Sequence, residues 1–206
     1  MDFYQVVNAR RTVRDLKEEA VSQEVLERVI AAGLKAPTHN HLREWEFIVL
    51  RTPEEKENAL QFVKARAKTQ SESIMDAFPA GSSQKRMYAD AMPKQYSMLF
   101  QSGCVILPFF KAGKGLFRGT NVSSFNALTA VWCCIENIFL AATAEGLACS
   151  MRIPVGDEGE NVAKAVGAPE GYLFPCYIGL GYPREDAVVL EQVEPDVKAV
   201  IHFGKW

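Results

Sequence analysis

A long apolar segment near the middle of the chain constrains the fold more than any other feature. It starts at Ser123 or Ser124, ends at Gly146, and carries apolar residues at helical spacing. One face of the expected helix holds Leu128, Val131, Trp132, Ile135, Ile138, Phe139 and Ala142. Because the other faces are also largely apolar, the pattern predicts a helix buried nearly all round. Either other helices cover it or a second subunit does. The apolar helix and an extended tail together favour an intertwined homodimer.

The segments around this helix predict an α+β fold, a mixed sheet flanked by helices. Strands and helices do not alternate strictly, which disfavours a doubly wound sheet. The 206 residues fit one domain, 1–206, with residues 190–206 as an extended C-terminal arm. Strands are expected over Trp45–Leu50, Cys104–Phe110, Leu147–Met151 and Tyr172–Leu180. Helices are expected over 2–9, 22–35 and 158–167, from Thr52 onward, and with breaks over 70–98, where Pro79–Ser83 reads as a mobile loop.

Composition narrows the classes of function and the cellular compartment that the chain is expected to have. A formal net charge of -2 argues against a general nucleic-acid binder. The five cysteines are odd in number and form no C-x-x-C pair, so we expect buried free thiols in a reducing compartment. The N-terminus has no signal-peptide pattern, and apolar stretches such as Val105–Phe110 are too short to span a bilayer. These features predict a cytoplasmic protein without a membrane partner.

Sequence motifs for hydrolysis or metal binding are missing. The chain has no G-x-S-x-G, H-E-x-x-H or Walker A sequence. His39 and His41 are two residues apart, but no cysteine or carboxylate stands at ligand spacing, so no metal site is predicted. Gly113–Gly119 imitates a nucleotide-binding loop with the wrong spacing, and we interpret it as a surface turn.

The basic cluster Arg10-Arg11-Thr12-Val13-Arg14 is the strongest candidate for ligand binding. In an extended segment, residues 10, 12 and 14 share one face. That face presents two guanidinium groups flanking a hydroxyl, a set of donors suited to phosphate. The alternative is a solvated basic run that follows a helix.

Four ordered segments together resemble the FMN-dependent nitroreductase family. They are Arg10–Arg14, Ala36–Thr38 leading into Trp45–Val49, Glu136–Ala142 through Glu145–Leu147, and Tyr177–Pro183. The order and spacing match over nearly the whole chain. The resemblance implies an α+β sheet flanked by helices in a domain-exchanged homodimer. It also implies two FMN molecules at the subunit interface.

The resemblance assigns most of the flavin contacts to two segments. Arg10 and Thr12, with Arg11 beside them, would hold the phosphate and ribityl chain, and Arg14 would approach the N1/O2 edge of the isoalloxazine. A cation there favours the anionic reduced flavin. The loop Pro154-Val155-Gly156 would donate a backbone N–H to flavin N5, from Val155 or from Gly156.

A basic residue near the C-terminus completes the phosphate site in this family. Lys205 is the first choice here, with His202 and Lys198 as alternatives.

One loop departs from the family pattern. The family usually has Asn, any residue, then Gln-Pro-Trp, whereas this chain has His41-Leu42-Arg43-Glu44-Trp45. His41 therefore stands where the asparagine normally lies, and Asn40 could substitute through a loop shift. Arg43 replaces a neutral glutamine and adds positive charge near flavin or substrate.

The resemblance implies an FMN-dependent oxidoreductase. Hydride would pass from NAD(P)H through flavin to an electron-poor acceptor such as a nitroaromatic, a quinone or an activated alkene. The flavin carries this chemistry, so no obligate catalytic side chain is expected. The alternatives are a flavin-binding protein without turnover, an enzyme that consumes its own flavin, and a non-flavin phospholigand binder.

Overall fold

A five-stranded sheet forms the centre of the computed structural model, which describes residues 1–67, 76–112, 116 and 121–206. The strand order is β1-β2-β5-β3, and β4 also pairs with β2. All pairings between these strands are antiparallel, while an isolated parallel bridge joins Thr12 to Cys149 of β3. The α+β prediction is therefore confirmed. The strands are β1 (Trp45–Leu50), β2 (Cys104–Lys111), β3 (Ala148–Arg152), β4 (Tyr172–Leu173) and β5 (Tyr177–Gly181).

The single strand expected over Tyr172–Leu180 is two strands. Pro175 lies between β4 and β5, and proline has no N–H to donate to a ladder. β4 pairs with one end of β2, at Phe110 opposite Leu173, whereas β5 pairs near the other end, at Cys104 opposite Leu180. Both strands still lie against β2, so the sheet survives the break.

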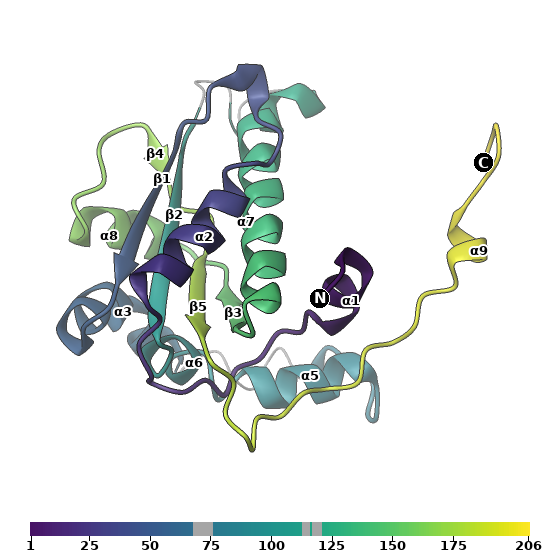
Figure 1. Ribbon diagram of the computed structural model, residues 1–206, viewed down its shortest axis with the longest axis horizontal. Helices are drawn as coiled ribbons and strands as arrows, with labels where there is room; N and C mark the ends of the chain where they lie inside the picture. Colours follow the sequence, from purple (N-terminus) through teal and green to yellow (C-terminus); the bar gives the residue numbers. More distant parts are fainter. Residues whose placement is uncertain (68–75, 113–115, 117–120) are drawn as a thin grey trace.

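Helices cover both faces of the sheet. On one face α7 packs against α2, β2 and β3, and this side holds the larger apolar core. On the other face α3, α6 and α8 enclose a second core. Figure 1 shows α2 and α7 crossing the sheet together. The bounds are α2 (Gln23–Gly33), α3 (Pro53–Ala67), α6 (Ser97–Phe100), α7 (Asn126–Ala144) and α8 (Glu158–Ala165).

The helix ends follow the predicted chemistry. Ser22 Oγ accepts from Val25 N–H at 3.3 Å, which caps α2. Thr52 and Glu55 form the expected reciprocal box at the start of α3, at 2.9 and 3.2 Å. Gly146, at φ +77°, ends α7 in the left-handed conformation that glycine favours.

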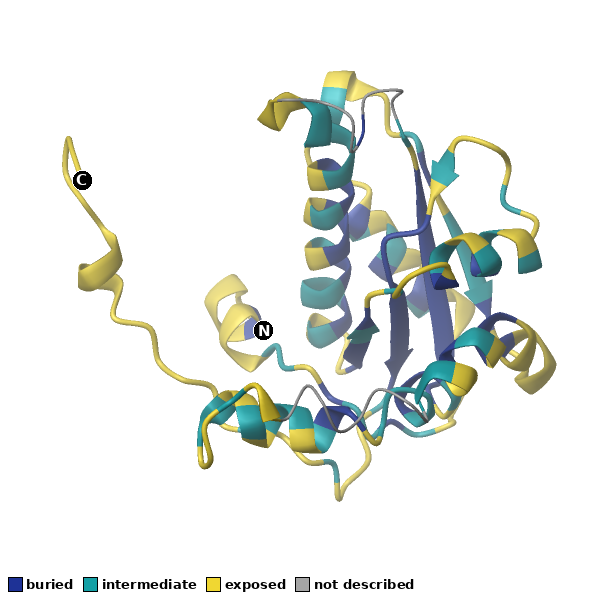
Figure 2. Ribbon diagram, turned by 180° about the vertical axis from the view of Figure 1, so that it is seen from behind, coloured by how far each residue is buried: buried dark blue, intermediate teal, exposed yellow. Residues whose placement is uncertain are grey.

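The central helix is buried on one face in a single chain, not all round. Val131, Cys134 and Ile138 are fully buried against α2 and the sheet, while Trp132 is only half-buried and Cys133 is exposed. Figure 2 shows the alternation along α7. The prediction that all five thiols are buried is wrong for Cys133, which lies on this outer side.

The same helix also revises the expectation about membrane spans. Together with the preceding 3-10 turn, Val122–Ala144 is long and apolar enough to cross a bilayer. Core helices of soluble proteins meet the same criterion, and here one face packs against α2, β2 and β3.

The two ends of the chain stand away from the sheet. Figures 1 and 2 show α1 (Phe3–Ala9) beside the lower end of α7 and the C-terminal arm running outward, exposed along its length. The last twenty residues are not wholly extended, because Asp196 caps a one-turn helix, α9 (Val197–Val200). Helices with breaks are expected over 70–98. In this region α5 (Ser83–Ala91) follows the Pro79–Ser83 turn, and residues 68–75 lie outside the described ranges. The predicted surface turn Gly113–Gly119 also lies outside them, apart from residue 116.

Candidate functional site

The basic segment lies against the outer edge of β3, the last strand in the sheet order. Val13 N–H donates to Cys149 O at 3.1 Å, next to the parallel bridge between Thr12 and Cys149. The Val13 side chain points inward and packs with Leu16 and Ala148. An extended backbone with Val13 inward turns its neighbours outward, as the sequence predicted.

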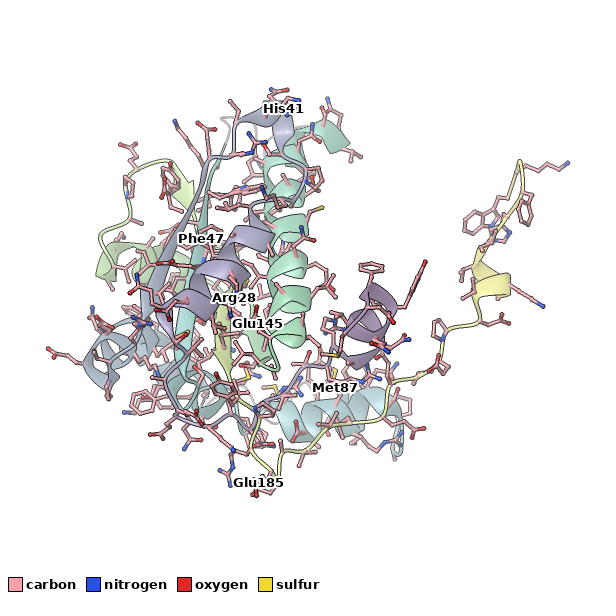
Figure 3. The ribbon with its side chains drawn as sticks, in the orientation of Figure 1. Arg28, His41, Phe47, Met87, Glu145 and Glu185 are labelled. Atoms are coloured by element: carbon pink, nitrogen blue, oxygen red, sulfur yellow. The ribbon has the colours of Figure 1, made fainter. Side chains whose placement is uncertain are left out.

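A cavity of about 290 Å³ lies in front of this segment. Three parts of the chain line it: the basic segment, α5, and the start of the C-terminal arm. The lining residues are Arg10, Arg11, Thr12, Arg14, Ser83, Gln84, Met87, Leu190, Glu191, Gln192 and Val193. The predicted phosphate ligands of the basic segment therefore share one hollow. Met87, labelled in Figure 3, contributes to its wall from α5.

Arg11 lies on this cavity although alternation assigns it to the opposite face. Its guanidinium donates to Asn8 O at 2.7 Å and to Arg10 O at 2.9 Å. These carbonyls lie at the end of α1, where helical carbonyls lack partners. Arg11 therefore caps the C-terminal end of α1 and also lines the cavity.

Arg10 keeps more freedom to bind an anion. Among the described residues its ion-pair partner is Glu136 of α7, at 3.6 Å, and the Glu136 side chain is 53% exposed. Exposed pairs of this kind contribute about 0–1 kcal/mol. Little free energy is therefore lost when a phosphate replaces Glu136 as the partner of Arg10.

Arg14 is held by a cluster of opposite charges that the sequence did not reveal. Its Nη1 lies 3.2 Å from Asp90 Oδ2, and both side chains are nearly buried. Lys94 Nζ bridges Asp90 Oδ1 at 2.6 Å and Asp15 Oδ2 at 2.7 Å. The cluster therefore contains two cations and two carboxylates, so part of the Arg14 charge is compensated.

The charge cluster also reaches the root of the C-terminal arm. Asp15 Oδ2 accepts from Val188 N–H at 3.1 Å. Burial alone would raise the pKa of Asp15, but the bonds from Lys94 and Val188 hold that pKa below its usual value. The arm thus starts from a defined position beside the basic segment.

The basic segment and the loop after β3 are both positioned by β3. The segment pairs with the strand at Cys149, and the loop follows the strand's last residue. A narrow hollow of about 40 Å³ runs from Arg10 and Thr12 past Cys149 to Met151, near the end of β3. Beyond it, Pro154 and Gly156 border an apolar cavity of about 710 Å³. Its aromatic walls are Phe110, Trp132, Tyr172 and Phe174. One strand therefore aligns the predicted phosphate, ribityl and N5 contacts.

The loop with the predicted asparagine substitute lies elsewhere. Figure 3 places His41 at the opposite end of α7 from Met87. Asn40, His41 and Arg43 all have positive φ, at 49°, 56° and 47°. Three non-glycine residues in this region cost about 1–3 kcal/mol each, a strain typical of ligand clamps. Within one chain this loop does not meet the basic segment.

The predicted phosphate ligands near the C-terminus are equally remote in a single chain. His202 and Lys205 are exposed near the end of the arm, where the His202 ring packs against Trp206 at 4.5 Å. The arm starts at the cavity, through Leu190 and Val193, and then leaves the body. The predicted site residues therefore form two groups. The basic segment and the loop after β3 lie along one strand, whereas the 40–43 loop and the end of the arm lie away from it.

Sequence reasoning missed Asp90, Lys94 and Glu158. Asp90 and Lys94 are an i,i+4 pair of opposite charges, and this spacing was the available signal. The polar region around them carries no motif. Glu158 stands two residues after Gly156, the end of the predicted loop, and is fully buried against Arg152.

Comparisons with known proteins agree with this arrangement. The model of the nitroreductase family matches residues 7–182. An iodotyrosine deiodinase of Haliscomenobacter hydrossis is 24% identical, over 97% of this chain and 87% of the relative. A candidate NADH dehydrogenase/NAD(P)H nitroreductase of Methanothermobacter thermautotrophicus is 25% identical, over 100% of this chain and 88% of the relative. The chain spans 62–66% of the length of the animal iodotyrosine deiodinases that it also matches.

A solved structure extends the comparison to the whole fold. The FMN-bound nitroreductase of Bacteroides fragilis superimposes with a TM-score of 0.71 at 19% identity, covering 98% of this chain and 99% of that one. At this identity the likeness establishes the fold. With the family model matching from α1 to the end of β5, the chain belongs to the nitroreductase family.

Proposed function

We propose that this protein is an FMN-dependent oxidoreductase that uses NAD(P)H to reduce an electron-poor acceptor. The observation that carries the proposal is the alignment of Arg10, Thr12 and the Pro154–Gly156 loop along β3, each beside a hollow. Guanidinium and hydroxyl donors suit the phosphate, and an apolar aromatic cavity suits a flat ring. When bound, FMN would supply the hydride chemistry.

The residues present fit FMN on chemical grounds. Arg10 has only a weak partner to give up, whereas the backbone beneath it is pinned to Cys149. Arg14 presents a partly compensated charge beside the same cavity. We assign Arg10 and Thr12 to phosphate and ribityl binding, and Arg14 to the flavin edge where negative charge builds on reduction.

We further propose that each site is shared between two copies of the chain. Three observations support this: the face of α7 that a single chain leaves uncovered, the exposed apolar arm, and the separation of the two groups of site residues. Phe203 and Trp206 are 91% and 100% exposed, which is unusual for large apolar side chains. A partner's arm would bring Lys205 or His202 to the cavity.

A second candidate acceptor follows from the relatives. The H. hydrossis protein is named an iodotyrosine deiodinase. An iodotyrosine is therefore a candidate acceptor beside nitroaromatics, quinones and activated alkenes. Its aromatic ring fits the character of the cavity next to Pro154 and Gly156.

An anaerobic titration tests the proposal. The purified protein should bind FMN, and NADH or NADPH should bleach the oxidised-flavin absorbance. Nitroaromatic, quinone and iodotyrosine, added separately, should restore it for the true acceptor. Absence of FMN binding contradicts the proposal. A bound flavin that neither nicotinamide bleaches indicates binding without turnover, and irreversible loss of flavin indicates a flavin-consuming enzyme.

A further inference from the structure

A buried ion pair braces the loop after β3 from inside. Arg152, the last residue of β3, and Glu158, the first of α8, have side chains 5% and 0% exposed. They form a bidentate pair, with Nε–Oε1 at 3.2 Å and Nη2–Oε2 at 2.8 Å. Arg152 Nη1 also donates to Gln95 Oε1 at 2.7 Å. Both ends of the loop are therefore tied to each other and to the segment before α6.

The same carboxylate reaches into the loop. Val155 N–H donates to Glu158 Oε2 at 3.4 Å, and Glu158 N–H donates to Val155 O at 3.2 Å. These reciprocal contacts engage the N–H of Val155. Of the two donors that the sequence left open for flavin N5, Gly156 is therefore the better candidate.

Gly156 is fixed from the outer side as well. Its φ of +61° favours glycine, and a Cβ there would lie 3.0 Å from Arg66 Nη2. Arg66 in turn pairs with Asp157. The loop thus lies between an inner carboxylate and an outer guanidinium.

A buried ion pair is not explained by stability alone. Replacing such a pair with apolar residues is often neutral or stabilising, because desolvation offsets the attraction. Here the pair spans the loop and contacts its backbone, which are features of a geometric role. We infer that Glu158, held by Arg152, is a positioning residue that sets the loop so that Gly156 N–H donates to flavin N5; this rests on the proposed FMN function.

The inference predicts a redox effect with a definite sign. Oxidised N5 accepts an N–H, whereas reduced N5 carries its own hydrogen. A well-placed donor therefore favours the oxidised form, and loosening it should weaken oxidised FMN more than reduced FMN. A tenfold difference between the two dissociation constants raises a two-electron potential by about 30 mV.

The test uses the FMN-loaded protein and two double variants that leave no lone buried charge. Arg152→Met with Glu158→Leu removes the brace, while Arg152→Met with Glu158→Gln keeps an oxygen that can accept from Val155 N–H. We expect the first to raise the potential and to weaken oxidised FMN roughly tenfold, and the second to return the potential toward the parental value. Lys56→Met is the control, because buried Lys56 donates to Phe100 O and Ser102 O instead of to the loop.

Each result is decisive. A parental potential in the folded Leu variant overturns the inference, as does an equal shift in the Leu and Gln variants or equal weakening of both redox states. A shift of the same size in Lys56→Met assigns the effect to general loosening and also overturns it. A parent that does not bind FMN contradicts the proposed function, which separates that failure from the failure of the positioning role.

Discussion

The basic segment and the C-terminal arm are expected to hold the same phosphate, yet they are built in opposite ways. The backbone at Thr12 and Val13 is tied to β3, and Arg14 is nearly buried against Asp90. Lys205, in contrast, lies on an exposed arm with no sheet beneath it. A chain can preorganise only the ligands that its own core supports. In the shared site proposed above, the basic segment is therefore folded in place within each chain, whereas the arm reaches the site only from a second copy.

Removing the arm should have the largest effect. Deletion of residues 190–206 takes away the exposed apolar surface and Lys205 while leaving the Asp15–Val188 contact intact. We expect loss of both the dimer and FMN binding, measured by light scattering and by flavin absorbance. A truncated chain that remains dimeric and yellow would show that the arm contributes to neither.

A substitution in the basic segment should weaken FMN binding less than removal of the arm does, but the effect should still be large. Arg10→Ala removes charge-assisted bonds of roughly 1.5–3 kcal/mol each, so FMN affinity should fall about ten- to a hundredfold in a fluorescence titration. Arg28→Ala is the matched control, because Arg28 of α2 pairs with Glu145, the residue after α7, away from the cavity (Figure 3). Equal affinity in Arg10→Ala and the parent would remove Arg10 from the phosphate site.

The Arg14–Asp90 pair allows a two-sided test. Arg14→Gln should lower the flavin midpoint potential, because the reduced anion loses a cation, and Asp90→Asn should raise it, because Arg14 loses its counter-charge. A change of about 1.4 kcal/mol corresponds to roughly 30 mV for two electrons. Spectroelectrochemical titration at saturating FMN measures both. Shifts of the same sign would place Arg14 away from the flavin edge.

The smallest effect concerns the root of the arm. The pKa of Asp15 is lower in the folded protein, so its ionised form stabilises the fold above the unfolded pKa. That stability is lost as the pH falls through the folded pKa, in the acid range below about pH 4. Asp15→Asn should therefore flatten the dependence of unfolding free energy on pH in that range. A parent and variant with parallel acid profiles would contradict this.

The sequence predicted the sheet-forming segments and helix ends best, because these depend on local chemistry. Ser22, Thr52 and Glu55 cap their helices as expected, and Trp45–Leu50 is a strand. The break at Pro175 was missed because the apolar content of the flanking residues outweighed one proline. The apolar surroundings of Cys133 also overstated its burial, since a single chain covers only one side of α7.

The candidate site was predictable where a motif existed and not where charges meet through the fold. Arg10 and Thr12 share a cavity as the spacing indicated. Asp90 comes to Arg14 from 76 residues away, and no local rule predicts such a pair. The positive φ of His41 and Arg43 was equally hidden, because neither residue type requires that conformation.

Subunit complementation tests whether each FMN site is shared between two copies of the chain. One chain carries Arg10→Ala, and the other carries alanine at Lys198, His202 and Lys205. If each site combines the basic segment of one copy with the arm of its partner, a heterodimer has one doubly damaged site and one intact site. Heterodimers of Arg10→Ala with Thr12→Ala are the control, because every site there keeps one defect.

The measurement is FMN binding by purified heterodimers carrying two different affinity tags. A shared site predicts weak FMN binding in both parent homodimers, one restored tight site in the complementing heterodimer, and none in the control. Weak binding at both sites of the complementing heterodimer would contradict a shared site, as would parental affinity in the homodimer that lacks the arm cations.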